Sequence, residues 1–217
     1  MDLDVVSAAL GCSGETAAQI IGQGRIRTYP VRAHLVRQGD RSTTAYLLIL
    51  GRAQALLYTF DGQTILLQEY RSGDLFGALV SLDPAAEDAD VIAIEEVRSF
   101  LLEAASLVGL AERHACIGLA LTRLLLKRLR MTSARMYERS ALSAKGRVCA
   151  ELLRLAREGE DMTIRPAPVI VELALRAATT RETASRTVNA LQRRGIVRRD
   201  PGGLVVTAPH RLEEELV

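Results

Sequence analysis

The stretch Thr179–Val197 reads TTRETASRTVNALQRRGIV and has the most regular pattern in the chain. Over residues 180–194, apolar side chains recur at steps of three and four, which is the spacing of one buried helix face. Those side chains are Ala184, Val188 and Leu191. Thr179 and Glu182 stand in the Thr-x-x-Glu relation of a capping box, which predicts where the helix begins. Gly195 follows in the position that commonly ends a helix, so the stretch predicts a capped amphipathic helix.

The segments on either side of this helix complete the pattern. Before it, four apolar residues at i, i+3, i+4 and i+7 predict a shorter helix: Ile170, Leu173, Ala174 and Ala177. Residues 178–179 separate the two helices. After the second helix, residues 196–199 and 204–207 read as strands joined by a turn at 200–203. Helix, short turn, helix and hairpin together predict a winged helix-turn-helix.

The exposed face of the second helix has the chemistry needed to read DNA bases. Arginine can donate two hydrogen bonds to guanine in the major groove, and glutamate can accept one from cytosine. We therefore expect Arg181, Glu182 and Arg186, in the first two turns, to contact bases. Hydroxyl and free N–H groups at the helix start suit phosphate, and the threonines there are Thr179, Thr180 and Thr183. The alternative is an ordinary surface helix in which Glu182 and Arg186 form an ion pair.

Composition and charge narrow the class of protein. Residues 1–110 carry 14 acidic and 8 basic side chains, a net charge of −6, whereas residues 111–217 carry 12 acidic and 20 basic ones, a net charge of +8. A basic half points to a polyanionic partner, here double-stranded DNA. No apolar run approaches the roughly 18 residues of a membrane span and the start is acidic, so we expect a cytoplasmic protein. Without a phosphate-binding loop, a nucleophile motif or paired catalytic carboxylates, we expect no enzyme.

Residues 25–102 have the pattern of an antiparallel β-barrel or β-roll. Short apolar runs alternate with turns that contain Gly or Asp. The expected strands are 34–36, 45–50, 53–58, 64–67, 91–94 and 99–102, and the expected turns are 38–40, 51, 61–62 and 72–74. Strands at this regular spacing are typical of a sandwich or barrel.

One long helix is expected over residues 116–137, which contain one Gly and no Pro. A stripe at steps of three and four runs along it: Thr122, Leu125, Leu129, Thr132 and Met136. This coiled-coil spacing favours a homodimer whose interface contains Leu125, Leu129, Thr132 and Met136. The alternative is a core helix packed on the barrel.

The chain is therefore expected to have three parts. Residues 1–106 form an effector domain, and 107–140 form the dimerisation helix and a polar hinge that begins near Tyr137. Residues 141–217 form the DNA-binding domain, which begins with an amphipathic helix ending near Glu158.

The stretch Thr179–Val197 closely resembles the recognition element of the Crp–Fnr family, named after the cyclic AMP receptor protein and the fumarate–nitrate regulator. The order of β-roll, long helix, hinge and winged helix over residues 25–208 resembles that family as well. The resemblance implies a homodimer that binds a two-fold symmetric DNA site and recruits or blocks RNA polymerase. Arg181, Glu182 and Arg186 match the base-contacting residues of the cyclic AMP branch, and Glu182, Ser185 and Arg186 match those of the other branch.

The chain departs from the family pattern in the helix-turn-helix. Ala178 stands at the turn where Gly is usual, so a positive φ there would cost more free energy than it would cost Gly. Val169, Ile170 and Val171 replace a polar start of the first helix, which removes some expected phosphate contacts.

The departures in the effector domain are larger. In the cyclic AMP binders of the family, a turn of the type Gly73–Gly77 is followed by a Glu for the ribose and an Arg-Ser pair for the cyclic phosphate. This chain has Ala78 at the Glu position and, at about the pair, Asp88 and Ala89. No Arg or Lys occurs in residues 78–94, so we expect no cyclic AMP binding at physiological concentration.

The effector itself is not identified from the sequence. Thr132 and Ser133 resemble the pair that contacts adenine, and we interpret them as polar packing residues unless a larger purine ligand, such as a cyclic dinucleotide, is bound. Scattered histidines and three cysteines predict no metal site and no cofactor. A rival hypothesis is a cyclic-nucleotide-binding regulatory protein that acts through protein contacts, for which the basic helix has no use.

Overall fold

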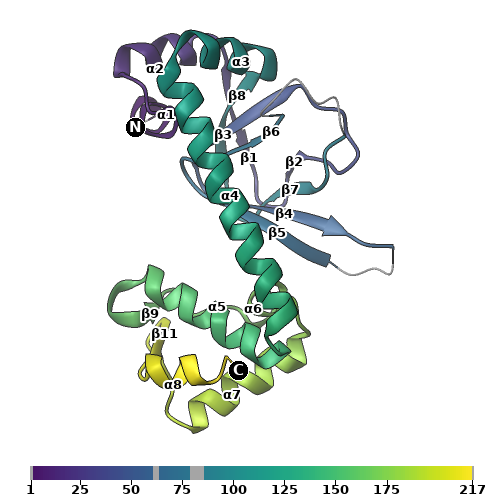
Figure 1. Ribbon diagram of the computed structural model, residues 1–217, viewed down its shortest axis with the longest axis vertical. Coiled ribbons are helices and arrows are strands. Elements are labelled where there is room, and N and C mark those ends of the chain that lie inside the picture. The colour runs from purple at the N-terminus through teal and green to yellow at the C-terminus, as the bar shows by residue number, and fades with distance from the viewer. Residues whose placement is uncertain (1, 61–63, 79–85, 217) are drawn as a thin grey trace. The chain divides into compact units, whose positions relative to one another are not determined.

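The computed structural model describes residues 2–60, 64–78 and 86–216. The chain forms two compact units, residues 1–129 and 130–217 (Figure 1). The hairpin turn expected at 61–62 lies outside the described residues.

The first unit is built on two antiparallel sheets, as the sequence predicts. One sheet has the order β1-β8-β3-β6, with β1 (Arg25–Tyr29), β8 (Val97–Glu103), β3 (Thr44–Leu50) and β6 (Leu75–Gly77). The other has the order β2-β7-β4-β5, with β2 (His34–Val36), β7 (Asp90–Ala93), β4 (Ala53–Tyr58) and β5 (Thr64–Tyr70). Every strand pair in both sheets is antiparallel.

The central strand β3 holds the roll together because almost all of it is buried. Leu48 is fully buried in one apolar cluster, and Leu47 is buried in a second cluster. The strand ends at Leu50, and the next residue, Gly51, has a φ of +89°. A Cβ added to Gly51 would lie 2.1 Å from the carbonyl oxygen of Glu96. Gly51 is therefore required both by the turn and by the close approach of the next chain segment.

Helices cover the first sheet and lead out of the first unit. They are α1 (Asp2–Leu10), α2 (Gly14–Ile21), α3 (Ala104–Arg113) and α4 (Ala115–Ala141). The predicted long helix is confirmed, and it is longer than expected: Tyr137–Ala141 are helical, and the break falls at residues 142–143. Among the described residues no single helix is long and apolar enough to cross a membrane, and α3 and α4 pass that test only as a pair bent by 118°.

The second unit has the predicted winged-helix order. After α5 (Ala144–Glu158) and a short 3₁₀ turn, its elements are β9 (Thr163–Ile164), α6 (Ile170–Arg176), α7 (Arg181–Arg193), β10 (Val197–Asp200), β11 (Gly203–Val206) and α8 (Pro209–Glu214). The three strands form one sheet of order β10-β11-β9. One apolar cluster, which includes Leu152, Leu173 and Leu191, joins the helices to this sheet.

A buried charge network fixes α6 against α5. Glu151 is 4% exposed and is paired with Arg154 and, at 3.5 Å, with Arg176 of α6. Arg154 in turn pairs with Glu138 at 2.6 Å. Because buried charges are tolerated only when they are paired, this network specifies where α6 lies.

Candidate nucleic-acid interface and effector region

The helix α7 is held by its apolar face and by a cap at its first turn. Ala184, Val188 and Leu191 are buried in the core of the second unit. The N-cap is Thr180, whose Oγ1 accepts a hydrogen bond from the Thr183 amide at 3.2 Å. The predicted capping box between Thr179 and Glu182 is therefore wrong by one residue.

Thr179 cannot cap α7 because it still belongs to the turn. Its amide donates to the carbonyl oxygen of Ala174 at 2.9 Å, which closes the end of α6. The Glu182 carboxylate lies beside its own backbone amide and the Thr180 hydroxyl, and these hydrogen bonds lower its pKa from the usual value. The start of α7 is thus closed by Thr180 and Glu182.

The turn between α6 and α7 takes the strained conformation anticipated at Ala178. Its φ is +47°, in the left-handed region that costs a residue with a Cβ more than it costs Gly. The guanidinium of Arg147, on α5, donates to the carbonyl oxygens of Ala177 and Ala178, each at 2.9 Å, and to that of Leu142 at 3.0 Å. Arg147 therefore holds the turn that sets the direction of α7.

The residues predicted to contact bases share the exposed side of α7. Arg181, Glu182 and Arg186 are exposed, and Ser185 is half-buried on the same side. Within the described parts of the chain, neither arginine is in an ion pair, so the alternative of a Glu182–Arg186 surface pair is not formed. Both guanidinium groups keep all their donors for a ligand.

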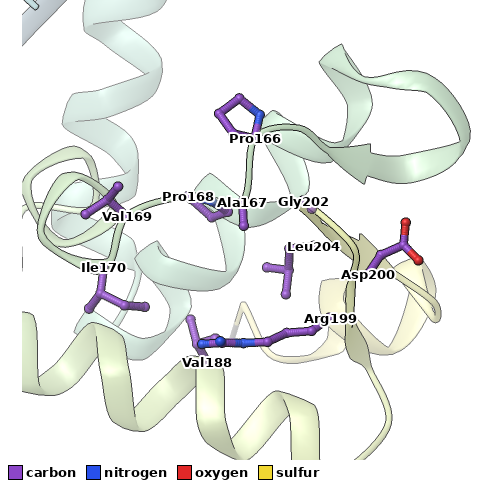
Figure 2. Close-up of a pocket in the computed structure, with 11 residues that line it drawn as sticks. Pro166, Ala167, Pro168, Val169, Ile170, Val188, Arg199, Asp200, Gly202 and Leu204 are labelled. Atoms are coloured by element: carbon purple, nitrogen blue, oxygen red, sulfur yellow. The ribbon is translucent and has the colours of Figure 1, made fainter.

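The wing lies beside an open, mostly apolar hollow of about 540 Å³ (Figure 2). Its lining includes Val169 and Ile170 at the start of α6, Val188 of α7, and Arg199 and Leu204 of the wing. Val169, the N-cap of α6, is 58% exposed and makes no side-chain capping hydrogen bond. The wing itself is held by Asp200, which pairs with Arg165 at 2.7 Å.

The stripe predicted to form the dimer interface is exposed along α4. Leu125, Leu129 and Met136 are 50%, 64% and 68% exposed, and Thr132 is exposed with them. By contrast, Ile117 on the same helix is fully buried in the first unit. The alternative of a core helix packed on the barrel therefore holds for the first turns of α4, whereas the stripe is exposed among the residues that the structure describes.

In the effector region the family's turn is present and forms part of the sheet. Backbone hydrogen bonds join this turn to β3. The Gly73 amide donates to the Leu48 carbonyl oxygen at 2.8 Å, and the Leu48 amide donates to the Asp74 carbonyl oxygen at 2.9 Å. The strand β6 follows directly and pairs with β3, an element that sequence reasoning missed because it is three residues long. Ala78 comes next, with its amide donating to Thr44 at 3.1 Å.

The residues at the expected Arg-Ser position lie in an acidic setting. Asp88 is exposed and Ala89 is buried. The neighbouring Glu87 exchanges backbone hydrogen bonds with residues 39–40, and burial, followed by the charges of Asp88 and Asp40, raises its pKa above the ordinary value. A phosphate placed here would meet negative rather than positive side chains.

Arg128 brings a cation to the effector region from α4. Its Nη2 donates to the Leu75 carbonyl oxygen, and its guanidinium carbon lies 5.7 Å from the ring centre of Tyr70, which stacks on Phe76. Its Nε is buried with no hydrogen-bond partner in the described residues. The sequence pattern places the phosphate site within residues 78–94 and therefore does not predict Arg128. The available signal was its position on α4, four residues before Thr132 and so on the same helix face.

The remaining candidates for ligand or metal binding are less enclosed. Thr132 and Ser133 are both exposed on the part of α4 that belongs to the second unit. Within residues 2–60, 64–78 and 86–216, no three His, Cys, Asp or Glu side chains are grouped as a metal site would require.

The comparison with known proteins agrees with the geometry of both units. The cyclic nucleotide-binding domain family matches residues 26–114, and the Crp-like helix-turn-helix domain family matches residues 146–215. The cyclic AMP receptor protein of Thermus thermophilus is 33% identical over 188 residues, covering 87% of this chain and 86% of that protein. This chain belongs to the Crp–Fnr family and is a DNA-binding transcription regulator; the relatives it matches are regulators rather than enzymes.

Solved structures show the same fold. The catabolite activator protein of Thermus thermophilus is 30% identical, with a TM-score of 0.54, and the match covers 95% of this chain and 96% of that one. A CooA variant from Carboxydothermus hydrogenoformans has a TM-score of 0.83 at 18% identity, covering 100% of this chain and 96% of that one. The predicted order of β-domain, long helix and helix-turn-helix is confirmed.

Proposed function

We propose that the chain acts as a homodimer that binds a two-fold symmetric DNA site through α7 and controls access of RNA polymerase in the cytoplasm. The observation that carries the proposal is that Arg181 and Arg186 are both exposed and neither forms an ion pair with a described residue. They lie on a helix whose start is capped by Thr180 and whose preceding turn is held by Arg147. A regulator that acted through protein contacts alone would have no use for such a helix.

The proposed contacts divide by chemistry. Arg181, Glu182, Ser185 and Arg186 contact base edges, because their side chains face outward from the first two turns of α7. Thr179, Thr180 and Thr183 lie at the amino end of α7, where backbone N–H groups and hydroxyls suit phosphate. The Thr180 hydroxyl caps the helix and donates its one proton to Thr183 Oγ1 at 3.1 Å, so it would contact phosphate only by turning that proton away from Thr183.

The homodimer is proposed from the exposed stripe on α4. Large apolar side chains lined up on one helix face are covered in most proteins, and a second copy of the same stripe is complementary by symmetry. Leu125, Leu129, Thr132 and Met136 would form this interface. Two copies of α7 would then read two half-sites of the same sequence.

We also propose that the effector region does not bind cyclic AMP at physiological concentration, although a relative carries the name cyclic AMP receptor protein. Ala78 offers no acceptor to a ribose, and Asp88 and Ala89 offer no cation to a phosphate. Asp40, Glu87 and Asp88 together oppose the one charge that Arg128 adds.

The DNA-binding proposal is tested by selecting bound duplexes from a random library with the full chain. The expected result is enrichment of one two-fold symmetric sequence, with half-sites about one helical turn apart. Enrichment of a single asymmetric half-site would contradict the dimer, and recovery of unenriched DNA would contradict base reading by α7.

A further inference from the structure

Two cysteines that are 104 positions apart in the sequence come together at the start of α4. Figure 1 shows α1 and α2 beside the first turns of α4, and one apolar cluster contains Val6 and Leu10 of α1 together with Ile117 of α4. Cys12 follows α1 and packs against this cluster, while Cys116 is the residue before Ile117.

The backbone at Gly11 shows how close the two segments are. A Cβ built on Gly11 would lie 3.7 Å from the carbonyl oxygen of Cys116 and 3.8 Å from the Cβ of Ala120. The next residue is Cys12, so its backbone is adjacent to the first turn of α4. Burial raises the pKa of the Cys12 thiol, and the nearby Cys116 sulfur raises it further.

We propose that Cys12 and Cys116 form a reversible intramolecular disulfide, which makes this junction an oxidation site for hydroperoxides. Cys12 lies in the short connection between α1 and α2, where its amide donates to the Ser7 carbonyl oxygen at 3.1 Å and its carbonyl oxygen accepts from the Ser7 hydroxyl at 2.6 Å. These bonds hold the Cys12 backbone beside the first turn of α4, so the disulfide needs mainly a side-chain adjustment. Cys116 is exposed and reaches a soluble oxidant first.

The chemistry balances with a hydroperoxide as the oxidant. The Cys116 thiolate attacks one peroxide oxygen, which gives a sulfenic acid and releases water or an alcohol after protonation. The Cys12 thiolate then attacks the Cys116 sulfur, the S–S bond forms, and hydroxide leaves and is protonated to water. Two thiols are oxidised and one peroxide is reduced.

The third cysteine provides an internal control. Cys149 is fully buried in the second unit, and burial is the main reason why its pKa is raised to about 11. A thiol that is neither ionised nor accessible does not react with a hydroperoxide under native conditions. Cys149 is therefore expected to stay reduced.

The test treats the full chain with hydrogen peroxide and measures the intact mass and a peptide map without reductant. We expect the mass of the single chain to fall by that of two hydrogen atoms. The peptide map should contain the Cys12 and Cys116 peptides joined by a disulfide, and dithiothreitol should restore the starting mass. Because the bond closes a loop of about 100 residues, the oxidised chain should melt roughly 5–10 °C higher.

The variants decide between this bond and other products. Cys12→Ser, Cys12→Ala and Cys116→Ser should abolish the mass loss and the thermal shift, whereas Cys149→Ser should keep both. A Cys116–Cys116 link between two chains, sulfinic acid on Cys116 with Cys12 still a thiol, or no reaction of either residue would overturn the proposal.

Discussion

The helix-turn-helix and the effector region of this protein differ from the family pattern to different degrees. Around α7, the substitutions leave the architecture in place: Ala178 accepts a φ of +47°, and Arg147 holds the turn by three hydrogen bonds. In the effector region, we propose that Ala78, Asp88 and Ala89 change the chemistry itself, with acidic and apolar groups at the positions where a cyclic nucleotide would need partners for its ribose and phosphate. On this proposal, the family fold keeps its DNA-binding helix while the ligand that its β-domain binds changes.

The largest effect is expected at the dimer stripe, on which two-fold reading of DNA depends. Leu129→Glu should give monomers, because each copy would bury a carboxylate without a partner, at a cost of about 3–5 kcal/mol per charge. Sedimentation velocity measures the result, with Leu119→Glu as the control, an exposed leucine outside the stripe. An intact dimer in Leu129→Glu would place the interface elsewhere.

The next largest effect should come from the residue that holds the α6–α7 turn. Arg147→Ala removes three charge-assisted hydrogen bonds to carbonyl groups and should lower the free energy of unfolding of the second unit by about 2–4 kcal/mol. Thermal or urea unfolding measures this. Arg157→Ala is the matched control, because Arg157 is on the same helix with an exposed ion pair to Glu213. Equal stability of the two variants would remove the proposed role of Arg147.

A smaller effect is expected at the bases. Arg186→Ala should weaken binding to the selected site by about 1–3 kcal/mol and leave binding to random DNA much less changed. Fluorescence anisotropy with both duplexes measures the difference, again with Arg157→Ala as the control for the loss of one positive charge. If Arg186→Ala weakens both duplexes equally, Arg186 contacts phosphate rather than a base.

The smallest effect concerns the strain at Ala178. Ala178→Gly relieves a left-handed conformation but adds conformational entropy to the unfolded chain, so the net stabilisation should be about 0.5–1 kcal/mol. A rise in melting temperature of a few degrees is the expected result in differential scanning calorimetry. A fall would mean that the turn is not strained by its Cβ.

The sequence predicts well where structure is local and poorly where it is not. The helix over residues 181–193 and the hairpin after it follow from spacings of three and four and from Gly and Pro at fixed offsets, so both were predictable. The N-cap was misplaced by one residue because Thr179 bonds back to Ala174, which the pattern alone does not show.

The groups missed by sequence reasoning depend on contacts between distant segments. The strand β6 exists because it pairs with β3, and Arg128 reaches Leu75 across 53 positions. The pair Cys12 and Cys116 is likewise brought together by packing of α1 against α4. The base-contacting residues, the dimer and the domain boundaries stay predictions.

The proposal that the chain does not bind cyclic AMP is tested most directly by isothermal titration of the full chain with cyclic AMP. A missing charge-assisted phosphate contact, with a carboxylate in its place, should weaken binding by two decades or more, at about 1.4 kcal/mol per decade. We predict no heat of binding at micromolar ligand in the wild type or in Arg128→Ala. A dissociation constant of about 10 μM or tighter in the wild type would contradict the prediction. If that binding were lost in Arg128→Ala, Arg128 would be the phosphate anchor.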